Sequence, residues 1–244
     1  MKCKMDQGQG TGRPGLAAVA GAMLILCGGL SGCEKKEPPK PPPLVAETVS
    51  VTDDASPALS WVAMETLKPG KWEAIEGAAE LGWDDGSETL RIGVGYYLNG
   101  VRWAGPLPTV PYEVELEARR VSGSDFFCGL TFPARSENEC VSLIVGGWGG
   151  SLVGISSIDG LDAAENSTAS QHEFEDKRWY RIRVKVGKDQ LQAWIDDGQV
   201  VNVETAGLKL SLREGPIEAC APFGFATWET SAEIRGVRWR KLGD

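Results

Sequence analysis

The chain has 244 residues, of which 42% are hydrophobic and 24% charged, a composition that excludes a disordered protein. Its net charge of −9 argues against nucleic acid as a partner, because phosphate binding needs a basic surface. Nine Trp accompany a single His, which excludes sites built from several histidines.

Residues 1–32 have the pattern of an export signal. A basic start is followed by the uncharged stretch 16–30, which is shorter than the roughly 20 residues of a membrane span. The stretch ends in Leu30-Ser-Gly-Cys33, which resembles a bacterial lipobox. The resemblance implies cleavage before Cys33 and acylation of its thiol. We therefore predict a lipoprotein signal peptide over 1–32.

The segment 33–70 is predicted to be a tether. It begins with the lipidated Cys33 and continues through the Pro-rich charged run 34–43, which is typical of an extended spacer. Buried acyl chains would hold the protein on a lipid bilayer. The expected location is the bacterial cell envelope, lipid-anchored on the exported side of a membrane.

Residues 71–242 are predicted to form one all-β domain. The segment 112–119 alternates apolar residues with charged ones, which is typical of a half-buried strand. The carboxylates of Glu113, Glu115 and Glu117 would then line its solvated side. Further strands are expected at 126–132, 140–145, 152–156, 179–186, 190–196, 200–203, 223–227 and 232–239. Many short strands without helical periodicity predict a single antiparallel β-sandwich.

Three cysteines remain after cleavage at Cys33. Cys128 and Cys140 flank a predicted hairpin turn, and export permits a disulfide between them. Cys220 is then free, or it pairs with one of the other two instead.

The strand pair Trp179-Tyr-Arg-Ile-Arg-Val and Leu191-Gln-Ala-Trp-Ile-Asp-Asp-Gly, with the closing strand 232–239, resembles concanavalin-like and laminin-G-like jelly rolls. Within that superfamily the segment 70–242 is similar to the 3-keto-disaccharide hydrolase domains, formerly a domain of unknown function. Such domains are abundant in planctomycete-type envelope proteins. The resemblance implies a carbohydrate ligand and glycoside hydrolysis of the 3-keto type; by itself it assigns no residue a role.

The segment 159–166 is the first candidate site. Asp159, Asp162 and Glu165 are candidate catalytic carboxylates, and Asn166 is a candidate substrate-binding amide. Asp159 and Asp162 are also candidate Ca²⁺ ligands, since hard oxygen donors suit that ion. An ordinary polar turn is the third interpretation. No other cofactor is expected.

Exposed tryptophans are the second candidate feature, because the C–H faces of sugar rings stack on indoles. Trp148 lies in the glycine-rich run 146–150, and Trp103 lies in an Asn-Gly-containing segment. Trp194 is on the opposite side of its strand from Leu191, Ala193 and Ile195, so it is expected to face outward. We predict that these three bind substrate; packing in the core or at its edge is the alternative for each of them.

Three functions are compatible with these features. The first is an envelope-anchored domain that binds carbohydrate and hydrolyses glycosides. The second, the main alternative, is a non-catalytic adhesion or scaffold module of the laminin-G-like type. The third is a plain structural lipoprotein. The protein partners of such a module are not specified by the sequence.

Overall fold

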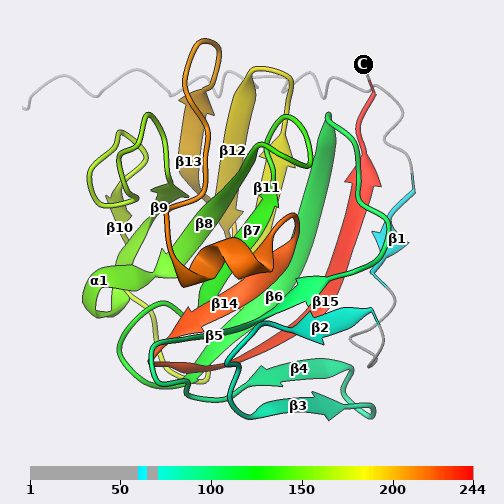
Figure 1. Cartoon of the computed structure of the whole chain (residues 1–244), viewed down its shortest axis with the longest axis vertical. Coiled ribbons are helices and arrows are strands. Elements are labelled where there is room, and N and C mark those ends of the chain that lie inside the picture. Colours follow the sequence, from blue (N-terminus) through cyan, green and yellow to red (C-terminus); the bar gives the residue numbers. More distant parts are fainter. Residues whose placement is uncertain (1–59, 65–70, 244) are drawn as a thin grey trace, which may run out of the picture. The chain divides into compact units, whose positions relative to one another are not determined.

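The computed structural model describes residues 60–64 and 71–243, which form two antiparallel sheets packed as a sandwich (Figure 1). The eight-stranded sheet has the order β13 (Gly198–Glu204), β12 (Gln190–Ile195), β11 (Tyr180–Val186), β6 (Tyr112–Ser122), β15 (Ser231–Lys241), β4 (Thr89–Ile92), β3 (Leu81–Asp84), with β1 (Val62–Ala63) beside β15. The seven-stranded sheet has the order β10 (Ser170–Gln171), β9 (Leu152–Ser156), β8 (Cys140–Gly146), β7 (Cys128–Pro133), β14 (Gly224–Trp228), β5 (Leu98–Trp103), β2 (Trp72–Ala74).

The predicted all-β sandwich is confirmed. Helical structure in the described ranges is confined to two short pieces, α1 (Gly147–Gly150) and the 3₁₀ turn η1 (Pro216–Cys220). Each predicted strand is present with bounds shifted by at most a few residues. The strands β1 to β5 and β10 were not predicted, because they are short and their apolar residues do not alternate clearly. β1 lies in the predicted lead-in and pairs with β15 at Trp239 and Arg238.

The main core lies between the two sheets. β6 and β11 bury alternate residues against it, as their sequence pattern predicts, and the facing strands of the seven-stranded sheet supply Leu130, Phe132, Leu143 and Val145. The buried Tyr112 hydroxyl donates a 2.6 Å hydrogen bond to the Pro133 carbonyl oxygen, so its one polar group is satisfied.

A smaller apolar cluster covers the other face of the seven-stranded sheet. It joins Ile144 of β8 and Ala226 of β14 to Ile217 and Cys220 of η1. Figure 1 shows η1, the orange helical turn, in front of these strands. Both faces of β7, β8 and β9 are therefore buried. The candidate site described below opens beside this cluster.

The outer face of the eight-stranded sheet differs from the prediction. Glu113 was expected in solvent, but its side chain is 3% exposed and lies between Arg183 and Arg240. Glu115 pairs with Arg238, and Glu117 pairs with Arg235. Arginines of neighbouring strands thus pair with all three carboxylates and bury Glu113, whereas Glu117 stays 41% exposed as predicted.

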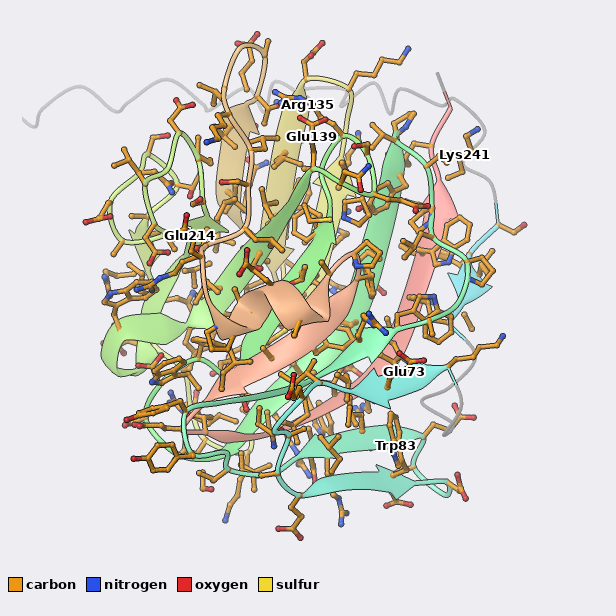
Figure 2. All side chains as sticks on the ribbon, in the orientation of Figure 1. Glu73, Trp83, Arg135, Glu139, Glu214 and Lys241 are labelled. Atoms are coloured by element: carbon orange, nitrogen blue, oxygen red, sulfur yellow. The ribbon has the colours of Figure 1, made fainter. Side chains whose placement is uncertain are left out.

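The predicted disulfide between Cys128 and Cys140 is wrong. Cys128 pairs with Val145 across the β7–β8 ladder, whereas Cys140 pairs with Pro133, so the two cysteines lie at opposite ends of the paired strands. The joining turn, where Arg135 pairs with Glu139 (Figure 2), is next to Cys140 alone. Cys128, Cys140 and Cys220 are all free and buried.

The predicted signal peptide 1–32, the lipidation site Cys33 and the Pro-rich run lie outside the described residues. Within 60–64 and 71–243, no helix is long and apolar enough to cross a bilayer.

Candidate functional site: an aromatic pocket on the seven-stranded sheet

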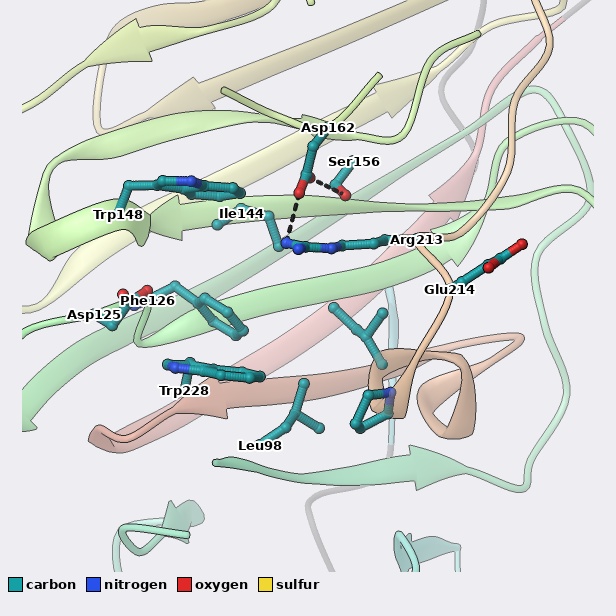
Figure 3. A pocket seen from close by; sticks show the side chains of 12 residues that line it. Leu98, Asp125, Phe126, Ile144, Trp148, Ser156, Asp162, Arg213, Glu214 and Trp228 are labelled. Carbon is teal, nitrogen blue, oxygen red and sulfur yellow. Dashed lines mark hydrogen bonds and ion pairs between the residues drawn. The ribbon is translucent and has the colours of Figure 1, made fainter. Parts of the chain in front are cut away.

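A pocket of about 320 Å³ opens on the outer side of the seven-stranded sheet. This volume is at the lower end of the range of small-molecule sites. Its apolar lining comes from Leu98, Phe126, Ile144, Trp148, Pro216, Ile217 and Trp228. Its polar lining comes from Asp125, Ser156, Asp162, Arg213 and Glu214. We call this the aromatic pocket. Figure 3 shows Trp148 on one side, Phe126 and Trp228 on the other, and Arg213 with Asp162 toward one end.

Trp148 projects into the pocket from the tight turn α1. Its side chain is 46% exposed, and its backbone is left-handed at φ 48° and ψ 57°. A residue with a Cβ atom adopts this conformation at a cost of about 1–2 kcal/mol. Strained residues of this kind cluster at ligand sites. The prediction that Trp148 is exposed is correct.

The turn around Trp148 is fixed by contacts on its inner side. Arg120 donates to the Gly150 carbonyl oxygen at 3.4 Å, and it also binds Asp176 and the Phe174 carbonyl oxygen. Gly150 has φ +101°, and a Cβ atom there would lie 2.8 Å from the Arg120 guanidinium. The positive φ favours glycine here whatever the space, which explains part of the glycine-rich run.

The facing wall consists of Phe126 and Trp228, whose ring centroids are 6.5 Å apart. Alternation in β14 places Trp228, because Phe225 enters the main core while Ala226 and Trp228 face the smaller cluster. Phe126 lies in the turn before β7 and belongs to the smaller cluster, whereas Phe127 enters the main core. Sequence reasoning missed this wall. Phe126 and Phe127 precede β7, so period-two alternation could not decide which of the two rings faces outward.

Asp162 is the predicted carboxylate that lines the aromatic pocket. Its Oδ1 accepts hydrogen bonds from the Ser156 hydroxyl at 2.6 Å and the Ala163 N–H at 2.7 Å. Its Oδ2 lies 2.6 Å from Arg213 Nη1. The peptide bond that joins Ser156 to Ser157 is cis. The hydrogen bonds from Ser156 and Ala163 hold Asp162 in place, and its exposed partner Arg213 completes a polar pair that can contact a ligand edge.

Asp125 is a second carboxylate in the aromatic pocket. Its Oδ1 accepts a 2.7 Å hydrogen bond from the Phe126 N–H, so it caps the turn before β7. Arg213 and Glu214, from the connection between β13 and η1, also line the pocket. That connection has no hydrophobic pattern, and nothing in its sequence marks these two residues as functional.

A second hollow of about 830 Å³ adjoins the aromatic pocket, and we call it the polar hollow. The two share Asp162, Arg213 and Glu214. Its other charged lining residues are Glu137, Glu165, Lys209 and Glu218. Cys140 also lines it, and burial raises the pKa of that thiol to about 11, so the thiol is neutral at physiological pH.

The remaining predicted polar residues hold the loop rather than meeting in the aromatic pocket. Asp159 Oδ1 accepts from the Lys209 N–H at 2.7 Å. Asn166 Nδ2 donates to three carbonyl oxygens, including that of Ile155 at 2.7 Å. Glu165 lines only the polar hollow. The structure therefore separates Asp159 and Asn166 from Trp148.

The carboxylates of this loop do not converge on one point. Across the described ranges, no group of three or more His, Cys, Asp or Glu side chains is arranged to hold a metal ion. Calcium binding by Asp159 and Asp162 stays a prediction.

Two predicted substrate-binding tryptophans lie elsewhere. Trp103 was expected to be exposed, but it is 4% exposed, packs on Trp72 at 5.0 Å and donates to the Pro106 carbonyl oxygen. It faces the main core because β5 alternates with Val101 inward. Trp194 is on the outer face of the eight-stranded sheet, stacked on Arg183 at 4.2 Å, and so belongs to the opposite side of the sandwich.

Comparison with profiles of known families finds no match, and neither does comparison with curated protein sequences. Among solved structures, the carbohydrate binding module CBM66 from Bacillus subtilis is similar, with TM-score 0.46 and 12% identity, covering 70% of this chain and 95% of that one. LamA from Z. galactanivorans, solved with laminaritriose and laminaritetraose, has TM-score 0.48 and 13% identity over 75% of this chain and 98% of that one. Domain 4 of AbnA, an extracellular arabinanase from Geobacillus stearothermophilus, has TM-score 0.45 and 13% identity, covering 70% of this chain and 81% of that one.

Proposed function

We propose that the aromatic pocket binds a carbohydrate. The observation that carries this proposal is Trp148, an exposed indole held in left-handed backbone opposite Phe126 and Trp228. A sugar ring has apolar C–H faces, which stack on aromatic rings, and hydroxyl groups along its edge. The Asp162–Arg213 pair offers an acceptor and a donor for those hydroxyls.

The test is binding to a glycan array, followed by calorimetric titration of the best ligand. Trp148→Ala is expected to weaken binding at least tenfold, because it removes one of the two stacking walls. Trp194→Ala is the matched control, since it removes a half-buried indole from the opposite face. Equal affinities for Trp148→Ala and the unaltered protein would contradict the proposal.

Glycoside hydrolysis is a second candidate, because two carboxylates, Asp125 and Asp162, line the same pocket. Such a reaction needs one carboxyl group to protonate the leaving oxygen and a second to activate water or attack the sugar. Three contacts engage Asp162, which favours ligand positioning over proton transfer by that residue. Turnover of 3-keto-glucosides that is lost in both Asp125→Asn and Asp162→Asn would establish hydrolysis. Binding without turnover would establish a non-catalytic module.

For location, we propose that acylated Cys33 anchors the domain in a bacterial cell envelope, with the Pro-rich run as spacer. A single acyl chain binds a membrane only weakly, so lipoprotein-type multiple acylation is expected. Cys33→Ser should release the protein from the membrane fraction and remove the lipid mass from its N-terminal peptide. Retention of Cys33→Ser in the membrane fraction would contradict the anchor.

A further inference from the structure

The aromatic surface continues beyond the pocket. Trp228 stacks on Tyr97 with ring centroids 5.6 Å apart and an interplanar angle of 28°. Tyr97 in turn contacts Tyr96 at 4.4 Å. Tyr96 is 85% exposed and Tyr97 50% exposed, which is unusual for side chains of this size. Tyr96 and Tyr97, here called the tyrosine pair, therefore extend the Trp228 wall into solvent.

The tyrosine pair is held in place by its surroundings. The Tyr97 carbonyl oxygen accepts a 2.8 Å hydrogen bond from the Glu229 N–H. The buried Asn99 side chain donates to the Gly93 carbonyl oxygen at 2.9 Å and accepts from the Ala79 N–H, so it braces the turn that carries both tyrosines. A hydrogen bond with the Tyr96 hydroxyl raises the pKa of Tyr97. A preformed surface loses little entropy when it binds.

The site also continues in another direction, past Arg213. The polar hollow begins at the shared Asp162–Arg213 pair, and Figure 3 shows Glu214 beyond Arg213, away from Trp148 and Trp228. The tyrosine pair thus adjoins the aromatic pocket, and the aromatic pocket adjoins the polar hollow. A ligand confined to the aromatic pocket, of about 320 Å³, leaves the tyrosine pair and the polar hollow uncovered.

The charge of the polar hollow restricts the ligand. Asp162 and Arg213 neutralise each other, which leaves Lys209 against four carboxylates, those of Glu137, Glu165, Glu214 and Glu218. A polymer of uronic acids would meet like charge there. Neutral hydroxyl groups, in contrast, can donate hydrogen bonds to these carboxylates.

We infer that the site takes a linear, uncharged oligosaccharide of several units, which rests on Tyr96 and Tyr97 outside the aromatic pocket. This inference rests on the proposed carbohydrate binding. It predicts that affinity grows with chain length, because each added unit gains contacts on a preformed surface.

The experiment titrates the full-length protein with gluco-, manno- and xylo-oligosaccharides of two to six units, and with alginate and polygalacturonate oligomers of equal length. For the neutral series that binds, the hexasaccharide should bind at least tenfold more tightly than the disaccharide. Tyr96→Ala should weaken hexasaccharide binding about three- to tenfold, and disaccharide binding less than twofold. Because Tyr96 is 85% exposed, its removal does not threaten folding. Val94→Ala, an exposed change on the same turn, is the matched control.

The outcomes separate this inference from the proposed function. Affinity that is independent of length, or equal losses at all lengths in Tyr96→Ala, would overturn the extended site while carbohydrate binding stands. Preference for the uronic acid oligomers would overturn the uncharged ligand. Absence of binding to every oligosaccharide tested, in a protein that Trp fluorescence shows to be folded, would overturn both proposals.

Discussion

At the residue scale, Trp148 combines backbone strain with an exposed apolar side chain. Neither property stabilises the fold: its φ of 48° is unfavourable, and 46% of the side chain is in solvent. Stability alone would select glycine there, as at Gly146 and Gly149, which also have positive φ. The indole is therefore best explained by what it contacts in the aromatic pocket.

Two variants at position 148 should differ in stability in the order opposite to that usually found for Ala and Gly. Trp148→Gly and Trp148→Ala both lack the indole, so they differ only in the backbone cost of positive φ. Trp148→Gly should be the more stable by about 1 kcal/mol in urea unfolding, opposite to the usual preference for Ala over Gly. Both should lose carbohydrate binding. A more stable Trp148→Ala would show that the left-handed backbone is not imposed by the turn.

At the element scale, the sequence pattern of β6 predicts its buried apolar face but not the ion pairs on its other face. Its alternation correctly assigns Tyr112, Val114, Leu116 and Ala118 to the core. The burial of Glu113 does not follow from that pattern. Its partners Arg183 and Arg240 are 70 and 127 residues away, and only the sheet register brings them to the carboxylate.

Removing the charge of Glu113 should be costly. Glu113→Gln keeps the volume but leaves Arg183 and Arg240 facing a neutral group in a nearly buried position, so we expect a loss of about 2 kcal/mol in the free energy of unfolding. Asp197→Asn is the matched control, because the Arg181–Asp197 pair is exposed and should contribute less than about 0.5 kcal/mol. Similar urea midpoints for the two variants would contradict the buried role of Glu113.

At the scale of the whole molecule, the sandwich could be predicted, but of the aromatic pocket only Trp148 and Asp162 could. Period-two alternation depends on local sequence, and that is enough to identify two packed sheets. The aromatic pocket collects residues from six separated segments, including Trp148, Trp228 and Arg213, so its composition depends on strand order. The predicted loop 159–166 contributed only Asp162 to it. Trp103 was misassigned because its Asn-Gly context resembles a turn, although it lies within β5.

The three buried thiols test whether the sandwich unfolds as one unit. Cys128 lies in the main core, Cys220 in the smaller cluster and Cys140 at the polar hollow. Burial raises their pKa values to about 12, 12 and 11 from an unfolded value of 9.0. Because the thiolate is the reactive form, none should be alkylated in the native protein at pH 8. If both clusters unfold together, all three should become reactive at one urea concentration, together with the change in Trp fluorescence.

The same pKa shifts fix how stability depends on pH. The folded state holds the three protons more tightly than the unfolded chain, so their contribution is complete below pH 9 and is lost as pH rises toward 12. The buried Tyr112, whose pKa is raised well above 10 by desolvation, acts in the same direction. The urea midpoint should therefore stay level from pH 7 to 8.5 and fall steadily above pH 9.

In the alkylation experiment, mass spectrometry of the peptides shows which thiol reacts first. Alkylation of Cys220 before Cys128 would mean that the layer beside the aromatic pocket opens independently of the main core, and not together with it.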